Sequence, residues 1–255
     1  MQGKEIRLKR LRKHSDRLLI VPMDHGVSSG PIHGLKDFQS SIQSVIQGGA
    51  DAIILHNGLA KQVAGIINPA ECEIIMHLSA STSLSPYANR KGLVSSVQHA
   101  IRQGVSAVSV HVNLGERYEF EMLRDLGKVA EECDQWEIPL LAMMYVRDGK
   151  KESEYDPEKV SHAARIAEEL GADIVKVNYT GTTEGFAEVC SSVKIPVLIA
   201  GGPKTGSSTE FLAMVSDAIR AGAAGVSIGR NIFQSSHPTQ LVGKIRKILD
   251  QDEEQ

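Results

Sequence analysis

A local pattern that occurs four times along this 255-residue chain places the strongest limit on its fold. Each time, the end of an expected helix leads into glycine, then small residues, then an apolar strand, at residues 48–55, 104–110, 171–175 and 222–228. Glycine directly after a helix takes the left-handed conformation that other residues resist. The pattern therefore predicts helices that pass through tight loops directly into strands.

Four more apolar segments have the length of a strand, at residues 18–23, 73–78, 139–145 and 196–201. The stretches between strands are typical of helices. In residues 156–170, Asp156 is placed to cap the helix, Pro157 suits its first turn, and the apolar residues fall on one face. Alternating strands and helices predict an α/β protein with a closed parallel (β/α)8 barrel, the TIM barrel. A doubly wound open sheet is the alternative.

No proline-rich or serine-rich linker divides the chain, so we expect one barrel domain across residues 1–255. Residues 1–17 interleave lysine and arginine with leucine and isoleucine, which predicts a short amphipathic helix that closes one end of the barrel. A polyanion-binding arm is the alternative for this segment. Residues 250–255 are acidic, and we expect a frayed tail there.

Composition excludes several classes of protein. The net charge of −3 gives no reason to expect a nucleic-acid or membrane partner. No apolar run reaches the roughly 18 residues of a membrane span, and the N-terminus lacks the apolar core of a signal peptide. Cys72, Cys133 and Cys190 fit neither a disulfide framework nor a metal knuckle. We therefore expect a cytoplasmic protein.

Lys176 is the only charged residue inside the apolar run of residues 174–177. A buried ammonium group costs free energy unless it is paired or neutral, and an unprotonated lysine amine attacks carbonyl groups to form a Schiff base. Because side chains alternate across a strand, we expect Lys176 to point into the barrel and the flanking valines to face the helices. Lys176 is thus a candidate nucleophile, and a structural lysine paired with an acid is the alternative.

Polar residues follow the C-terminal ends of several expected strands, where barrels place their catalytic groups. Asp24 is a candidate carboxylate of the cleft or a helix cap, and Tyr145 is a candidate proton donor or a packing residue. The histidines among them could suggest a metal site, but no pair has the spacing of two ligands on a helix and strand-end carboxylates are few. We expect neither a metal nor an organic cofactor. The strand-end residues are Asp24, His25, His56, His77, His111, Tyr145 and Arg147.

The last two expected strands each run directly into glycine. Gly201 and Gly202 follow the seventh strand, and Gly229 with Arg230 follows the eighth. Glycines allow backbone N–H groups to approach an anion, and barrels often build a phosphate site from these two loops. The Arg230 guanidinium adds a bidentate donor. The two loops together predict a phosphorylated ligand.

Several motifs in this order resemble the archaeal-type class I aldolase family, and the resemblance covers nearly the whole chain. The motifs lie at residues 21–27, 143–145, 176–181, 200–205 and 229–233. The resemblance implies a Schiff-base lysine at Lys176, a proton acceptor at Asp24 and a proton donor at Tyr145. It also implies substrate or phosphate contacts from Asp24, His25, Arg147, Gly201, Gly202, Gly229 and Arg230.

The branch of the family that the chain resembles most transfers a ketone unit from a phosphorylated keto sugar to L-aspartate semialdehyde. The resemblance therefore implies those two small-molecule partners, a place on a 3-dehydroquinate route to aromatic amino acids, and a homo-oligomer. One alternative is an aldolase that uses dihydroxyacetone phosphate, to make an aminohydroxybenzoate precursor or to cleave fructose bisphosphate. The other alternative is a non-catalytic barrel that binds phosphosugars.

The chain departs from the family pattern at three places that we expect to lie around the substrate. Asn57 stands where lysine is usual, Val146 where proline is usual, and Val177 with Asn178 where Thr-Ser is usual. These changes bear on which substrate is used more than on the chemistry of the lysine.

Overall fold

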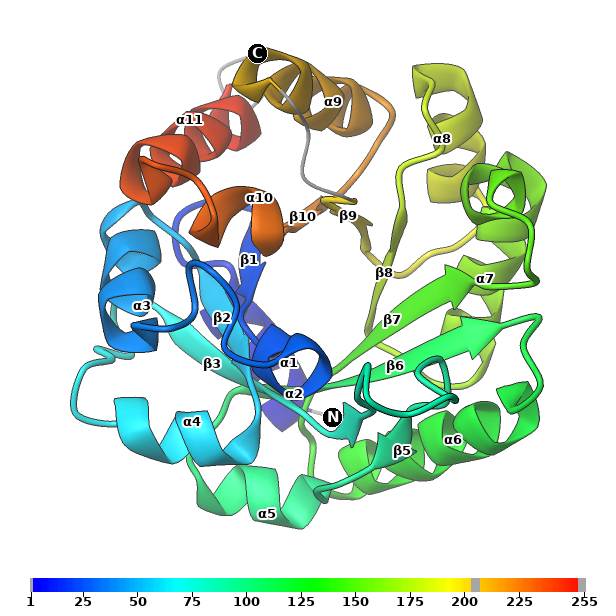
Figure 1. The fold of residues 1–255 in the computed structure, drawn as a ribbon, viewed down its shortest axis with the longest axis horizontal. Helices are drawn as coiled ribbons and strands as arrows, with labels where there is room; N and C mark the ends of the chain where they lie inside the picture. The colour runs from blue at the N-terminus through cyan, green and yellow to red at the C-terminus, as the bar shows by residue number, and fades with distance from the viewer. Residues whose placement is uncertain (1, 203–206, 252–255) are drawn as a thin grey trace.

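The computed structural model describes residues 2–202 and 207–251. Within them, eight parallel strands form a closed barrel with the neighbour order β1-β10-β9-β8-β7-β6-β3-β2 (Figure 1). Each expected strand is present, so the TIM barrel is confirmed and the open sheet is wrong. The strands are β1 (Leu18–Pro22), β2 (Ala52–Leu55), β3 (Glu73–His77), β6 (Ala107–Leu114), β7 (Leu140–Val146), β8 (Ile174–Asn178), β9 (Val197–Ala200) and β10 (Gly225–Ser227).

Helices follow the strands and form the outer ring of the barrel (Figure 1). The expected cap is in place in α7, where the Asp156 carboxylate accepts a hydrogen bond from the Lys159 backbone N–H at 3.0 Å and Pro157 occupies the first turn. The outer helices are α3 (Phe38–Gln47), α4 (Asn57–Val63), α5 (Val97–Arg102), α6 (Glu119–Gln135), α7 (Pro157–Glu169), α8 (Thr183–Ser191), α9 (Ser208–Arg220) and α11 (Pro238–Asp250).

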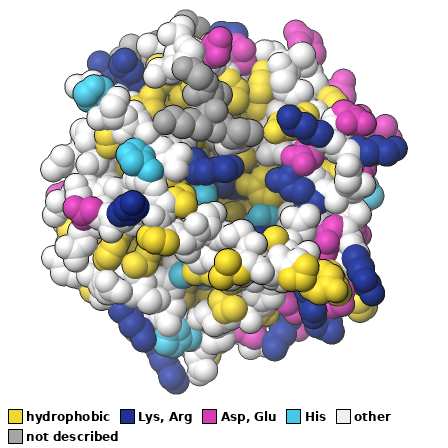
Figure 2. Space-filling view, in the orientation of Figure 1, with side chains coloured by type: hydrophobic (Ala, Val, Ile, Leu, Met, Phe, Trp, Pro, Cys, Tyr) yellow, Lys and Arg dark blue, Asp and Glu magenta, His cyan; other side chains and the backbone are white. Residues whose placement is uncertain are grey.

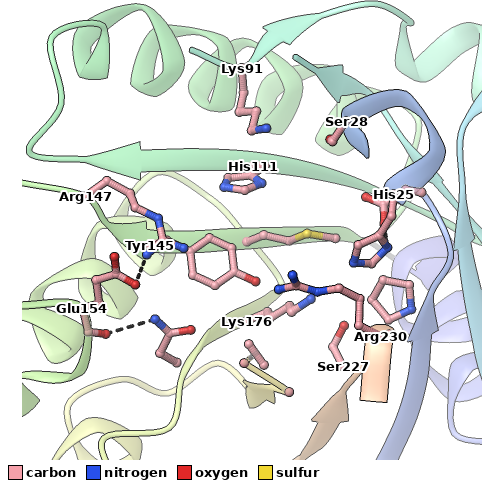
Figure 3. A pocket seen from close by; sticks show the side chains of 18 of the residues that line it. His25, Ser28, Lys91, His111, Tyr145, Arg147, Glu154, Lys176, Ser227 and Arg230 are labelled. Atoms are coloured by element: carbon pink, nitrogen blue, oxygen red, sulfur yellow. Dashed lines mark hydrogen bonds and ion pairs between the residues drawn. The ribbon is translucent and has the colours of Figure 1, made fainter. Parts of the chain in front are cut away.

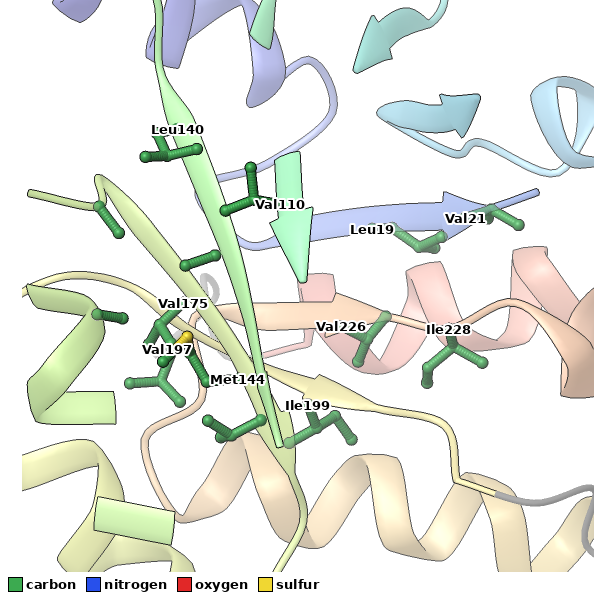
Figure 4. Close-up of a cluster of buried hydrophobic side chains, with 14 of the residues drawn as sticks. Leu19, Val21, Val110, Leu140, Met144, Val175, Val197, Ile199, Val226 and Ile228 are labelled. Carbon is green, nitrogen blue, oxygen red and sulfur yellow. The ribbon is translucent and has the colours of Figure 1, made fainter. Parts of the chain in front are cut away.

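Apolar side chains form two layers, one on each side of the barrel wall. The outer layer lies between strands and helices and includes Val175 of β8 and Val226 of β10 (Figure 4). Val177 of β8 belongs to the same layer. The inner layer fills the barrel and includes Ile174 of the same strand. Burial of each large aliphatic side chain contributes about 1.5–3 kcal/mol, so both layers fix which face of a strand points inward. The inner position of Lys176 follows from this alternation.

Helix α1 (Gln2–Leu11) closes the N-terminal end of the barrel, as expected, although it is shorter than residues 1–17. Leu11 is fully buried and joins the inner apolar layer. The Lys4 ammonium lies 2.6 Å from Asp134 and 3.1 Å from Asp173, and Lys13 lies 3.0 Å from Glu73. These basic residues pair with acids of the barrel itself, which argues against an arm that binds polyanions.

Short elements stand at the opposite end of the barrel, after the C-terminal ends of the strands. They are α2 (His25–Ser29), the two-stranded sheet of β4 (Ser79–Ala80) and β5 (Gly92–Leu93), the 3-10 helix η1 (Glu152–Tyr155), and α10 (Arg230–Phe233). The sequence did not predict β4, β5 or η1. These short elements carry or flank several of the residues that line the cavity described below.

Two expectations fall partly on residues that the structure does not describe. Residues 203–206 of the glycine-rich loop after β9 lie outside the described ranges, as do residues 252–255 of the acidic tail, and α11 ends at Asp250. Across residues 2–202 and 207–251, none of the helices combines the length and the hydropathy that a bilayer crossing requires.

Candidate active site

A cavity of about 260 Å³ opens at the C-terminal ends of the barrel strands. Basic and histidine side chains gather around the hollow on this face of the molecule (Figure 2). The cavity is lined by every residue to which the sequence analysis assigned catalysis or substrate binding. These are Asp24, His25, Tyr145, Arg147, Lys176, Gly201, Gly202, Gly229 and Arg230.

Lys176 lies on the inner face of β8, where it is next to Met143 of β7 and Leu198 of β9 in the barrel register. The residue is only 6% exposed, yet its side chain lines the cavity. Figure 3 shows it between Tyr145 and Arg230. A buried amine that still reaches the open cavity has the placement that a nucleophile toward a carbonyl group requires.

Asp24 directly precedes α2 and makes no capping hydrogen bond with its side chain, so the helix-cap alternative is wrong. Its carboxylate oxygens lie 3.4 Å from Nδ1 of His25 and 3.7 Å from Nε2 of His77. Burial alone would raise the pKa of Asp24, but the positive charge that His77, His25 and Lys176 can carry lowers it below its usual range. Asp24 is therefore ionised at neutral pH and can accept a proton.

The histidines of the site are held neutral by burial. Burial lowers the pKa of His77 to about 4, and it lowers the pKa of His111 well below the ordinary value. The pKa values of His25 and His56 are lowered for the same reason, although Asp24 acts in the opposite direction on both. His77 Nδ1 lies 2.8 Å from the Ser109 hydroxyl, and the ring itself packs 5.2 Å from the ring of His56.

His25 and His111 line the cavity, whereas His56 and His77 stand behind Asp24. Across the described ranges, no group of three or more His, Cys, Asp or Glu side chains is arranged to hold a metal ion. The rings of His77 and His111 form hydrogen bonds with Ser109 and Asn113, and those of His25 and His56 pack against Phe233 and His77.

Tyr145 stands at the end of β7 with its ring against two cavity residues. Its ring centroid lies 4.9 Å from that of His111, and the Arg147 guanidinium carbon lies 5.4 Å from it. In Figure 3 the phenol points into the cavity, toward the side that carries Lys176. A phenol in this position can donate a proton to a reacting oxygen atom.

The glycine loops after β9 and β10 meet at the side of the cavity that carries Arg230. The Asn231 amide donates a hydrogen bond to the Gly201 carbonyl at 2.8 Å, which ties the two loops together. At Gly229, an added Cβ atom would lie 2.5 Å from the Pro22 carbonyl oxygen and 2.7 Å from the His25 ring. Only glycine allows the backbone to pass this close to β1 and leaves room for an anion beside it.

Several residues of the cavity were not predicted from the sequence. Lys91 and Glu154 are charged and line it, and so does Ser28 of α2, on the same edge as Lys91 (Figure 3). Lys91 lies in the loop before β5 and the other two stand on short elements, all without a periodic pattern, so no local signal could have placed them. Of the three departures from the family pattern, only Asn178 lines the cavity. Asn57 Oδ1 accepts a hydrogen bond from His99 Nε2 at 2.8 Å, and Val146 is buried.

Comparison with known proteins extends this description. A model of the DeoC/LacD family of aldolases matches residues 18–235. The 2-amino-4,5-dihydroxy-6-oxo-7-(phosphonooxy)heptanoate synthase of Streptomyces griseus is 42% identical over 97% of this chain and 90% of its own length. The 2-amino-3,7-dideoxy-D-threo-hept-6-ulosonate synthase 1 of Archaeoglobus fulgidus is 45% identical over 98% of this chain and 92% of its own length.

Among solved structures, a Schiff-base-forming fructose-1,6-bisphosphate aldolase superposes with a TM-score of 0.87 at 28% identity. The superposition covers 95% of this chain and 99% of that one. An archaeal fructose 1,6-bisphosphate aldolase gives a TM-score of 0.85 at 29% identity, over 95% and 98% of the two chains. The sequence and structure comparisons therefore agree over nearly the whole barrel.

Proposed function

This chain belongs to the DeoC/LacD family of aldolases and is an enzyme of the class I type, and we propose that it adds a three-carbon ketone unit to L-aspartate semialdehyde. The ketone unit comes from a phosphorylated keto sugar, as the sequence resemblance implied. Lys176 forms the Schiff base, Tyr145 is the proton donor and Asp24 is the proton acceptor. Family membership argues against the alternative of a barrel that only binds phosphosugars.

The products named for the two relatives support this choice of acceptor. Each is a seven-carbon 2-amino acid with a ketone at C6 and hydroxyl groups at C4 and C5. An aldol bond between C4 and C5 divides each product into a four-carbon amino-acid aldehyde and a three-carbon ketone. The aldehyde is aspartate semialdehyde in both cases. The products differ at C7, which carries a phosphate in one and only hydrogen in the other.

The observation that carries the proposal is the position of Lys176. It is buried in the barrel wall, it reaches the cavity, and it lies between the Tyr145 phenol and Arg230 (Figure 3). A ketone whose phosphate is held at the Arg230 side would therefore present its carbonyl carbon to the lysine amine. Bringing these groups together removes much of the entropic cost of their encounter.

In the first half of the reaction, the unprotonated amine of Lys176 attacks the ketone of the donor. A proton reaches the departing oxygen atom, water leaves, and an iminium ion remains. The iminium accepts the electron pair of the adjacent carbon–carbon bond when a base removes the proton of the neighbouring hydroxyl group. The bond breaks, an aldehyde departs, and the three-carbon unit stays on Lys176 as an enamine.

In the second half, the enamine carbon attacks the aldehyde carbon of the acceptor. The new alkoxide takes a proton, and water hydrolyses the iminium to release the product and free Lys176. Asp24, ionised and adjacent to the cavity, accepts protons in these steps, and Tyr145 donates them. Each such proton transfer contributes about 10²- to 10⁴-fold in rate.

The glycine loops and Arg230 hold the phosphate of the donor. Backbone N–H groups of Gly201, Gly202 and Gly229 can approach its oxygen atoms because no side chain intervenes, and the Arg230 guanidinium supplies charge. His25 lies beside Gly229 and borders the same side of the cavity. This site serves any donor with a terminal phosphate.

A second candidate donor is dihydroxyacetone phosphate, because the Streptomyces relative is named for a product with phosphate at C7. Lys176 would again form an iminium ion with the ketone. The enamine would then arise by loss of a proton from the carbon next to the iminium carbon instead of by carbon–carbon cleavage. Fructose bisphosphate cleavage is a further alternative from the structural relatives, at lower identity.

Borohydride trapping tests the proposed function. Purified protein is incubated with 6-deoxy-5-ketofructose 1-phosphate, dihydroxyacetone phosphate or fructose 1,6-bisphosphate, reduced with borohydride, and digested for peptide mass analysis. We expect a stable adduct on Lys176 with the true donor and product formation once L-aspartate semialdehyde is added. Lys176→Met should abolish both the adduct and the activity.

The exposed Lys61→Met variant on α4 is the matched control and should behave as the wild type. Active protein that gives no adduct, or full activity in Lys176→Met, would contradict the proposal. The homo-oligomer implied by the resemblance stays a prediction, which sedimentation velocity would test.

A further inference from the structure

Charged side chains border the cavity from three directions. Arg230 and the glycine loops form one side, Arg147 and Glu154 lie across Tyr145 from them, and Lys91 stands at a third edge, beyond His111 (Figure 3). The first side is assigned to phosphate above. Lys91, Arg147 and Glu154, which we term the distal triad, have no role in the Schiff-base steps.

Lys91 is a cation held beside the cavity by its own loop. Its ammonium group donates a hydrogen bond to the Ser81 hydroxyl at 2.5 Å, and the Asn113 amide fixes the loop to β6 through the Asn89 carbonyl at 2.7 Å. Burial lowers the pKa of Lys91, and Arg147 lowers it further, although Asp24 acts in the opposite direction. Throughout the described part of the chain, no carboxylate oxygen lies within 4.0 Å of this ammonium group. A partly desolvated cation without an acid partner favours an anionic ligand.

Glu154 is the acid of the distal triad, and its position is fixed from two directions. Its carboxylate forms an ion pair with the Arg147 guanidinium. Its backbone carbonyl accepts a hydrogen bond from the Asn178 amide at 3.1 Å. Asn178, one of the residues that depart from the family pattern, thus holds η1 against the cavity. Both Arg147 and Glu154 remain partly exposed to the cavity, with side chains 29% and 24% exposed.

We propose that the distal triad is the subsite for the α-amino-acid end of the acceptor aldehyde. Lys91 and Arg147 bind its carboxylate, and Glu154 binds its α-ammonium group. This inference rests on the proposed function, since it assigns a role to residues of the same cavity. An ammonium group has three donors and a guanidinium group has five, so both cations retain donors beyond their present partners.

The arrangement of charge matches a zwitterion in preference to a simple anion. The Arg147–Glu154 ion pair and the Lys91 ammonium group border the same cavity, so it offers partners of both signs to one ligand. If the phosphate stays on the transferred three-carbon unit, as with dihydroxyacetone phosphate, the Arg230 side holds it away from the acceptor carboxylate. If the phosphate leaves with the departing aldehyde, the acceptor enters only after it has gone. The aldehyde carbon of the acceptor then faces the space between Tyr145 and Lys176, where the enamine forms.

Two acceptor aldehydes separate the roles of the triad. L-aspartate semialdehyde carries both the carboxylate and the α-ammonium group, whereas succinic semialdehyde has the same chain length and lacks the ammonium group. In Glu154→Gln, the ratio of kcat/KM for the first aldehyde over the second should fall by about 10- to 100-fold, because a charge-assisted hydrogen bond is lost for one substrate only. In Lys91→Met, kcat/KM should fall by about 10-fold or more for both aldehydes, with the ratio unchanged.

Borohydride trapping of the donor on Lys176 is measured for every variant, because this half-reaction needs no acceptor. An adduct shows that the barrel is folded and that the proposed lysine chemistry operates. The exposed residues Lys61 and Glu158 supply the matched controls Lys61→Met and Glu158→Gln, which should leave the ratio at the wild-type value.

The outcomes for the two proposals are distinct. A wild type that gives no adduct would overturn the proposed function. If Glu154→Gln traps the donor normally and its ratio of kcat/KM for L-aspartate semialdehyde over succinic semialdehyde is unchanged, only the role proposed for the distal triad is overturned. If Glu154→Gln fails to trap the donor, the Lys91→Met variant decides: equal kcat/KM to the wild type with both aldehydes would reject the subsite.

Discussion

His77 offers a direct test of the electrostatics of the site. Its side chain is 4% exposed, its Nδ1 atom lies 2.8 Å from the Ser109 hydroxyl, and burial lowers its pKa to about 4 from the ordinary 6.5, although Asp24 acts in the opposite direction. The folded protein therefore keeps this imidazole neutral at pH values where the unfolded chain binds a proton.

The sign and size of the effect on stability follow from these two pKa values. As the pH falls below about 6.5 the unfolded state gains a proton that the folded state does not, so the free energy of unfolding decreases until about pH 4. Between about pH 7 and about pH 5 this one residue should lower the free energy of unfolding by about 2 kcal/mol. The His77→Asn variant lacks the titration but keeps a hydrogen-bonding group near Ser109. Over the same pH range, the free energy of unfolding of His77→Asn should therefore fall by about 2 kcal/mol less than that of the wild type.

Urea denaturation at a series of pH values measures this difference, because the other titrating groups are common to both proteins. His162→Asn, at an exposed position on α7, is the control and should follow the wild type. Equal losses of stability in the wild type and His77→Asn would refute the reasoning. NMR titration of the His77 ring is an independent check, and a charged ring at about pH 6 in the folded protein would likewise refute it.

Two further substitutions test the N-terminal end of the barrel. Arg246 lies 2.9 Å from the fully buried Asp51 carboxylate and also donates to the Arg17 carbonyl at 2.9 Å. Arg246→Met should destabilise the protein by about 3–5 kcal/mol in urea denaturation, because it leaves the buried Asp51 carboxylate without its cation. Adding Asp51→Asn should recover part of this stability. A loss below about 1 kcal/mol in Arg246→Met would contradict this explanation. Gly225 has φ +140°, and an added Cβ atom would lie 2.1 Å from the Leu18 carbonyl oxygen, so Gly225→Ala should cost more than about 2 kcal/mol in the same assay. Gly127→Ala, in an open position on α6, should instead stabilise by about 0.5–1 kcal/mol, and equal effects at the two glycines would show that the barrel wall yields at Gly225.

Strand alternation is the part of the site that could be predicted from the order of residues alone. Val175 and Val177 belong to the apolar layer that faces the helices, and Ile174 belongs to the layer inside the barrel. Because side chains alternate along a strand, Lys176 shares the inner face with Ile174. The same local rules place Asp24, Tyr145 and Arg230 after the C-terminal ends of their strands. Because parallel strands of a closed barrel all end at one rim, residues far apart in the chain had to meet there.

The positions of the loop residues that complete the cavity depend on contacts that form only in the folded barrel. Lys91 and Glu154 lie on segments without periodic pattern, and the paths of these segments depend on contacts made across the barrel, such as Asn113 with Asn89 and Asn178 with the Glu154 carbonyl. The charge state of the histidines was also beyond the sequence. A histidine at a strand end looks the same whether it faces water or a buried carboxylate, and its pKa depends on the packing around it, which forms only when all the strands are assembled.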